Sequence, residues 1–149
     1  MKKPAAFGLG LAALGVAGVV ASRVLGSTPE EPGFDGPLPL CDGSLNCYRI
    51  RRVYNADPDT VLDAVRAALY DSGDWLTGRA VRVTPTEGGF RAIVKTGPFR
   101  DDVEVAVLPG AAGQAVLHAR SASRIGENDL GLNRLRVRRL LDDVAERVG

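Results

Sequence analysis

Valine occupies every second position from 103 to 107, and this pattern constrains the fold more than any other feature of the 149-residue chain. Successive side chains of a β-strand point to opposite faces, so the three valines make one apolar face while Asp102 and Glu104 lie on the other. A second alternating run follows over residues 114–121. Together the two runs predict an antiparallel hairpin with one buried face.

The register of this hairpin follows from the assumption of a five-residue loop over residues 109–113. The valines then lie opposite alanine or leucine. On the charged face, the predicted cross-strand pairs are Asp102 with Arg120 and Glu104 with His118. Both faces are chemically consistent, which favours this register.

The part of the chain before the hairpin gives both strand and helix signals. Residues 48–54 are rich in β-branched and aromatic types and predict a strand with a bulge or an edge position. Asp57 followed by Pro58 predicts the start of a helix, which Gly73 ends. Apolar alternation on both sides of the turn at 87–89 predicts two further strands.

The C-terminal residues predict a second amphipathic helix that begins at Asn128 or Asp129. Its apolar stripe has helical spacing and comprises Leu130, Val137, Leu140, Leu141, Val144 and Val148. Asn133 falls inside this stripe. Two i,i+4 ion pairs are expected on the solvent side: Arg138–Asp142 and Arg139–Asp143.

The resulting order is strand, helix, four strands, helix. We therefore expect an α+β fold, with an antiparallel five-stranded sheet and two helices on one face. The arrangement resembles helix-grip domains, which often hold a ligand between the sheet and the last helix. That resemblance implies a cavity lined by valines, leucines and Phe90, with an arginine at its mouth.

Residues 1–26 are expected to be a targeting segment, because Lys2 and Lys3 precede a long apolar run. Two alternatives remain. Residues 4–25 are long enough to stay in the membrane as a signal anchor, or a signal peptide is cleaved after Ala21. The domain is extracytoplasmic in both cases, membrane-anchored in the first and secreted or periplasmic in the second.

Residues 27–47 are rich in proline and glycine and predict a linker before a single domain over 48–149. Cys41 and Cys47 bracket a turn-forming sequence at the end of this linker. In an oxidising compartment this spacing favours a structural disulfide. A metal site is disfavoured because two cysteines without neighbouring histidines supply too few ligands.

Residues 120–126 (Arg-Ser-Ala-Ser-Arg-Ile-Gly) and 128–136 (Asn-Asp-Leu-Gly-Leu-Asn-Arg-Leu-Arg) resemble the signature of domain-of-unknown-function family 1499. Shorter blocks resemble other parts of the family pattern: Cys41, Leu45-Asn46-Cys47 and Asp101-Asp102-Val103. The likeness covers roughly residues 40–149. No biochemical activity comes with the family, so the resemblance supplies no catalytic residues.

The signature block allows two interpretations. In the first, a hydrogen-bonded latch fixes the entry angle of the last helix, and it comprises Arg124, Asp129, Asn133, Arg134 and Arg136. A buried Asn133 would then find its partners in Ser121 or Ser123. In the second, Arg120, Arg124 and Arg134 receive a lipid phosphate or carboxylate together with the helix N-terminus.

Several function classes are disfavoured. The formal net charge of +1 gives no electrostatic footprint for nucleic acid. His118 is the one histidine of the chain and has no evident nucleophile beside it, so we expect no enzyme, no metal and no cofactor. The expected function is a non-catalytic binding module for a lipid-like or anionic small ligand. The alternative is a structural or interaction protein of the cell envelope, whose partner is an envelope protein.

Overall fold

The computed structural model describes residues 35–71 and 78–149. Its elements, in chain order, are β1 (Cys47–Tyr54), α2 (Pro58–Asp71), β2 (Arg79–Thr86), β3 (Gly89–Thr96), β4 (Phe99–Pro109), β5 (Ala115–Ser123) and α3 (Leu132–Val148). This order confirms the predicted α+β class. The predicted targeting segment at 1–26 and the predicted helix end at Gly73 lie outside the described residues. Within the described part of the chain, no helix has the length and apolar character needed to span a membrane.

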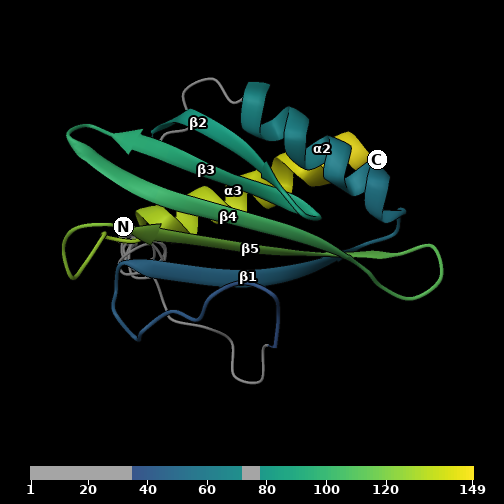
Figure 1. Ribbon diagram of the computed structural model, residues 1–149, viewed down its shortest axis with the longest axis horizontal. Coiled ribbons are helices and arrows are strands. Elements are labelled where there is room, and N and C mark those ends of the chain that lie inside the picture. Colours follow the sequence, from purple (N-terminus) through teal and green to yellow (C-terminus); the bar gives the residue numbers. More distant parts are fainter. Residues whose placement is uncertain (1–34, 72–77) are drawn as a thin grey trace, which may run out of the picture.

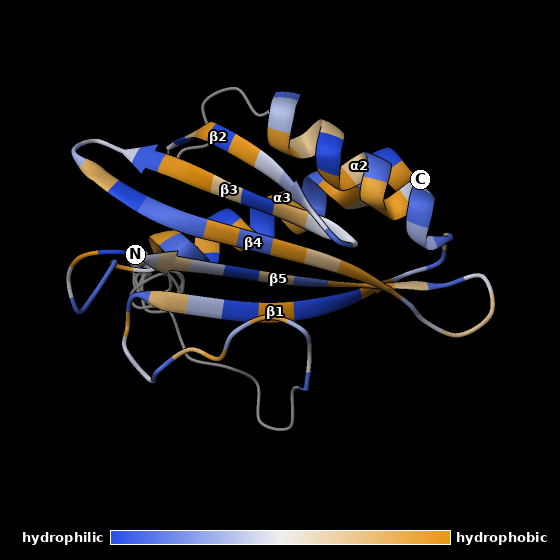
Figure 2. Cartoon of the chain, in the orientation of Figure 1, coloured by the Kyte–Doolittle hydropathy of each residue, from blue (hydrophilic) through white to orange (hydrophobic). Residues whose placement is uncertain are grey.

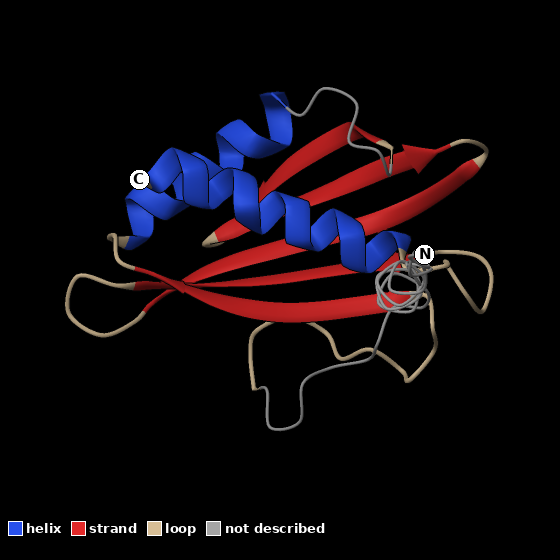
Figure 3. Cartoon of the chain, turned by 180° about the vertical axis from the view of Figure 1, so that it is seen from behind, coloured by secondary structure: helices blue, strands red, loops and turns tan. Residues whose placement is uncertain are grey.

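The five strands form one antiparallel sheet in the order β1-β5-β4-β3-β2. Both helices cover the same face of this twisted sheet, as predicted (Figures 1 and 3). We call the opposite face of the sheet, which is turned toward the viewer in Figure 1, the outer face. β1 occupies an edge, as expected, and pairs with β5 over its full length without a bulge.

Strand alternation places the core between the sheet and the helices. The valines of β4 are buried, and Figure 2 shows apolar and polar residues alternating along this strand. The hydrophobic core also includes Phe90 of β3 and Leu117 of β5. α2 contributes the apolar face that includes Val61 and Leu69, and α3 contributes the predicted stripe from Val137 onward. Burial of such side chains contributes about 1.5–3 kcal/mol each.

The start of α2 follows the sequence prediction. Pro58 is the first helical residue, and Asp57 precedes it as the cap. A carboxylate oxygen of Asp57 accepts a 2.9 Å hydrogen bond from the backbone N–H of Thr60. This bond satisfies one of the N–H groups that the first helical turn leaves without an intrahelical acceptor.

The predicted register of the β4–β5 hairpin is wrong by two residues. Glu104 pairs with Arg120 rather than His118, and Asp102 faces Ala122. The loop spans residues 110–114 instead, and two backbone hydrogen bonds, Gly110 N–H to Gln114 O and Gln114 N–H to Ala111 O, close it. A shift of two residues leaves every side chain on its predicted face, so the apolar pattern could not distinguish the registers.

The last helix begins at Leu132, later than predicted. Leu130 adopts a left-handed conformation with φ 54° in the preceding turn, and its side chain is 65% exposed. It therefore does not continue the helical stripe. The two predicted i,i+4 ion pairs on α3 are also wrong, because Asp142 pairs with Arg52 of β1 and Asp143 with Arg147.

The predicted disulfide is confirmed. Cys41 and Cys47 are bonded, with their Cα atoms 5.7 Å apart. The bond ties the segment before β1 to the first residue of that strand.

Candidate functional site

A network of polar side chains lies between the end of the sheet and the start of α3. Asn133 is at its centre and is completely buried. Its amide oxygen accepts hydrogen bonds from the hydroxyl of Ser121 and from the guanidinium of Arg136. Its amide nitrogen donates to the backbone oxygen of Asn46 at 2.7 Å and to the hydroxyl of Ser123 at 3.0 Å. All the hydrogen-bonding positions of this amide are thereby satisfied.

Arg136 extends the network to β4. Its guanidinium donates to a carboxylate oxygen of Asp101 at 2.6 Å and to the hydroxyl of Thr96 at 3.1 Å. Burial lowers the pKa of Arg136, and the charge of Asp101 opposes that effect. The buried guanidinium therefore depends on this carboxylate for compensation.

Asp129 holds the N-terminus of α3. One of its carboxylate oxygens accepts a 2.8 Å hydrogen bond from Gly131 N–H, and the other accepts one of 2.8 Å from Asn133 N–H. The second interpretation expected an external anion at this helix N-terminus. The carboxylate of Asp129 occupies that place instead. We call Asp101, Ser121, Ser123, Asp129, Asn133 and Arg136 the buried polar cluster.

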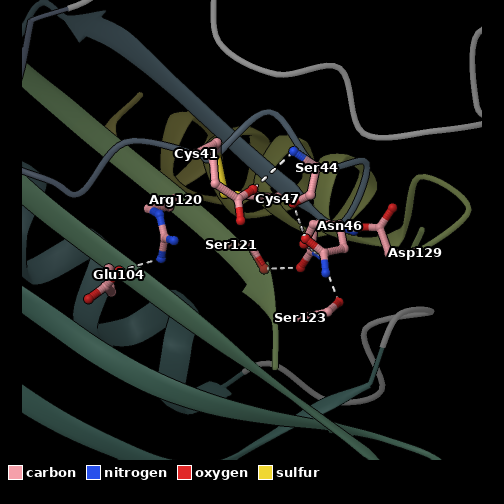
Figure 4. Close-up of a disulfide and its surroundings, with 11 residues drawn as sticks. Cys41, Ser44, Asn46, Cys47, Glu104, Arg120, Ser121, Ser123 and Asp129 are labelled. Carbon is pink, nitrogen blue, oxygen red and sulfur yellow. Dashed lines mark hydrogen bonds and ion pairs between the residues drawn. A yellow bond between two sulfur atoms is a disulfide. The ribbon is translucent and has the colours of Figure 1, made fainter. Parts of the chain in front are cut away.

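The disulfide loop is attached directly to this cluster. The backbone oxygen of Asn46 accepts from Ser123 N–H at 2.9 Å, and that of Leu45 accepts from Asp129 N–H at 3.3 Å. The side-chain amide of Asn46 donates to Gly126 O. Figure 4 shows Asn46 beside Cys47 and above Ser123. Cys47 of the disulfide therefore directly follows Asn46, whose backbone oxygen binds Asn133 at the start of α3.

Two arginines of the signature block lie on the outer face of the sheet. Arg120 donates to Glu104 at 2.8 Å (Figure 4). Arg124 binds Asp102 through two hydrogen bonds of 2.9 and 2.8 Å. These bonds hold the pKa of Asp102 below its ordinary range. Arg124 and Asp102 therefore remain an ion pair over the whole neutral pH range.

The structure separates the three arginines that the second interpretation required. Arg120 and Arg124 lie on the outer face, while the guanidinium of Arg134 lies 5.9 Å from the ring centre of Tyr48, an inward-facing residue of β1. They do not converge on one anion. In contrast, Asp129, Asn133 and Arg136 of the predicted latch come together with Ser121 and Ser123. Arg124, which the latch interpretation also included, instead binds Asp102 on the outer face, and Arg134 lies over the ring of Tyr48.

His118 is also on the outer face and is 3% exposed. Gly36 lies so close to its ring that a β-carbon at residue 36 would be 2.5 Å from Nδ1. Burial lowers the pKa of His118, and the charges of Arg49 and Arg51 lower it further. The imidazole is therefore covered by the chain and neutral at pH 7.

A row of basic residues crosses the outer face at one end of the sheet, and of its members only Arg124 was predicted as a site residue from the sequence. Arg79 of β2 pairs with Lys95 of β3, and Lys95 pairs with Arg100 of β4. The backbone N–H of Arg124, just after β5, donates to the backbone oxygen of Arg100. We call Arg79, Lys95, Arg100 and Arg124 the basic row. All four side chains are exposed, and among the described residues no acid pairs with the first three.

An open pocket of about 480 Å³ lies along this row. It is lined by Lys95, Gly97, Pro98, Arg100, Arg124 and Ile125. Gly97 and Pro98 form the two-residue turn between β3 and β4, and the positive φ of 58° at Gly97 is what such a turn requires. Lys95 and Arg100 can each donate hydrogen bonds to a phosphate or carboxylate in this pocket.

Comparison with known protein families identifies the chain. The model of a protein family of unknown function, DUF1499, matches residues 45–144. The chain belongs to this family. No curated protein matches it. The DUF1499 match includes the whole buried polar cluster and the whole basic row, whereas Cys41 precedes it.

Within the described residues of this DUF1499 domain, no three histidine, cysteine, aspartate or glutamate side chains form a group that could hold a metal. Four members of its site region, Asp101, Arg79, Lys95 and Arg100, were not among the site residues predicted from the sequence. Asp101 falls on the apolar face of β4 by alternation, and an acid at such a position signals a buried partner. Lys95 and Arg100 gave no such signal, because only strand pairing brings them together.

Proposed function

We propose that this DUF1499 domain is a non-catalytic binding module for an anionic group, held on the extracytoplasmic side of a membrane by residues 4–25. The observation that carries the proposal is the pocket beside Lys95 and Arg100, two exposed cations to which no described acid is paired. Arg124, already bound to Asp102, supplies a third and fixed cation at its wall. Phosphate and carboxylate are the groups that such a set of donors binds.

Two features support a binding role over a catalytic one. Gly36 covers the ring of His118, and two arginines lie near it. The imidazole is therefore poorly placed to exchange a proton with a substrate. The buried polar cluster is occupied by its own hydrogen bonds and holds α3 to the sheet. The ligand site therefore lies on the outer face, and not in the apolar cavity that the helix-grip resemblance implied. The residues expected around that cavity, including Phe90 and Val105, belong to the packed core.

The test is a titration of the full chain in detergent micelles with inorganic phosphate, followed by backbone amide chemical shifts. We expect saturable shifts at residues 95–100 and 124–125, with sodium chloride at equal ionic strength giving none. Lys95→Gln with Arg100→Gln should abolish them. The matched control, Arg138→Gln with Arg139→Gln on the exposed side of α3, should keep them. Equal shifts in both double variants would refute a specific site.

A role as a structural or interaction protein of the envelope is the second candidate. It is favoured by large apolar side chains that the structure leaves exposed, including Leu40 (67%), Ile125 (73%) and Leu130 (65%). Purification from its own membrane distinguishes the two. A stoichiometric protein partner, with no phosphate-dependent shifts, would favour the second function.

A further inference from the structure

We infer that the anion received by the basic row is the phosphate of phospholipid headgroups, and that the domain docks on an anionic bilayer through this end of its sheet. The inference rests on the proposed function and specifies its ligand. It is carried by the width of the row, by the apolar side chains beside it and by the distribution of charge over the domain.

The row is too wide for a single small anion. Neighbouring strands lie about 4.8 Å apart, so residues at matching positions on four strands span about 14 Å. Arg79 and Arg124 are at the two ends of this span. A bilayer surface presents many phosphates side by side and can engage all four cations at once. A free phosphate ion can engage only the two or three that line the pocket.

Exposed apolar side chains border the row. Ile125 lines the pocket itself and is 73% exposed. Phe99, which follows the β3–β4 turn and is 54% exposed, lies at the same end of the sheet but on its helix-facing side, opposite Thr96. Val81, two residues after Arg79, is 45% exposed. Cations beside apolar side chains are the combination that binds membrane interfaces, because the cations contact the headgroups while the apolar groups enter the acyl boundary. A site for a soluble anion gains nothing from these apolar groups.

The charge distribution favours one orientation of the domain on a membrane. Exposed arginines lie on the outer face beside the row, including Arg82 of β2, which lies opposite Ile93. On the other side of the sheet, the excess acids of α2 and the excess arginines of α3 balance, so the two helices together carry no net charge. An anionic surface therefore attracts the outer face more strongly than the helix side.

The proposed anchor makes the docking feasible. Nine residues, 26–34, separate the end of the predicted anchor from the first described residue. Even fully extended they reach only about 30 Å. The domain would thus stay close to the bilayer, where even weak headgroup contacts are favoured by the high effective concentration.

The experiment compares hydrogen exchange of the full chain in nanodiscs of phosphatidylcholine alone with nanodiscs of equal parts phosphatidylcholine and phosphatidylglycerol. We expect the anionic lipid to slow amide exchange at residues 97–100 and 124–131. Lys95→Glu with Arg100→Glu should reduce this lipid-dependent protection by at least about 30-fold, since each cation lost near an anionic surface costs about fivefold and the added carboxylates are repelled as well. Arg138→Glu with Arg139→Glu makes the same charge change on α3 and should preserve it. Ile125→Ser should weaken it with no loss of folding, because this side chain is exposed.

Three results would overturn the inference. The first is equal exchange in both kinds of nanodisc. The second is protection that survives Lys95→Glu with Arg100→Glu. The third is protection by added polyglutamate but not by phosphatidylglycerol, which would indicate an acidic protein as the partner. If phosphate still shifts the amides of the pocket while the lipid gives no protection, the proposed function stands and only the membrane docking fails. If phosphate gives no shifts either, both fail.

Discussion

Arg136 of α3 donates a 2.6 Å hydrogen bond to Asp101 of β4, and the two side chains are 0% and 5% exposed. The contact joins the second turn of the last helix to the strand in the middle of the sheet. Both charges are removed from water, so each depends on the other for compensation. The domain therefore holds its C-terminal helix by polar contacts at the helix start and by apolar packing along the rest.

Replacing Arg136 with methionine should lower the free energy of unfolding by about 3–5 kcal/mol, because Asp101 then remains buried without its cation. Urea unfolding followed by circular dichroism measures the change. Asp101→Leu in the Arg136→Met background should restore part of the loss. Arg139→Met, on the exposed side of the same helix, is the control and should change the free energy by less than about 0.5 kcal/mol. A loss of similar size in the control would contradict the role of the pair.

Replacing Asn133 with leucine should destabilise the domain by about 3 kcal/mol. The change removes four hydrogen bonds, and in the buried part of the network the Ser121 hydroxyl loses its acceptor and Arg136 loses one of its acceptors. Urea unfolding again measures the effect. Arg138→Leu on the exposed side of α3 is the matched control. A leucine variant as stable as the native chain would show that the network contributes no net stability.

Reduction of the Cys41–Cys47 disulfide should cost about 2 kcal/mol of stability through the entropy of the unfolded chain. It should also loosen the start of α3, because the loop accepts hydrogen bonds from Ser123 and Asp129. Hydrogen exchange should therefore quicken at these two amides on addition of a reductant, and less so in the β2–β3 hairpin. Uniform quickening across the domain would indicate global destabilisation only.

Stability should fall as the pH drops below the ordinary pKa of histidine, 6.5, and His118 should account for the change. Its pKa is lowered in the folded protein, so between 6.5 and the folded value the unfolded chain binds a proton that the folded chain does not. This contribution to stability is fully present above pH 6.5 and is lost as the pH falls to the folded pKa. His118→Gln removes it. The difference in unfolding free energy between native chain and variant should thus change between about pH 8 and about pH 5. A constant difference would refute the assignment.

Much of the fold could be predicted because its signals are local. The alternating valines of β4 indicated a buried face, and Asp57 with Pro58 indicated the start of α2. Asn133 and Arg136 were expected in one cluster because they share a helix with apolar spacing. The start of that helix was misplaced, since Leu130 and Gly131 both adopt left-handed conformations that the apolar pattern does not encode.

The sequence by itself determined which side chains face the core, because alternation along a strand and spacing along a helix depend only on neighbouring residues. Only the tertiary structure decided which distant residues meet. The pairing of Glu104 with Arg120 depended on loop hydrogen bonds, since a shift of two residues preserves both faces of a strand. The basic row depended on strand order, which places Arg79, Lys95 and Arg100 side by side although they are separated along the chain.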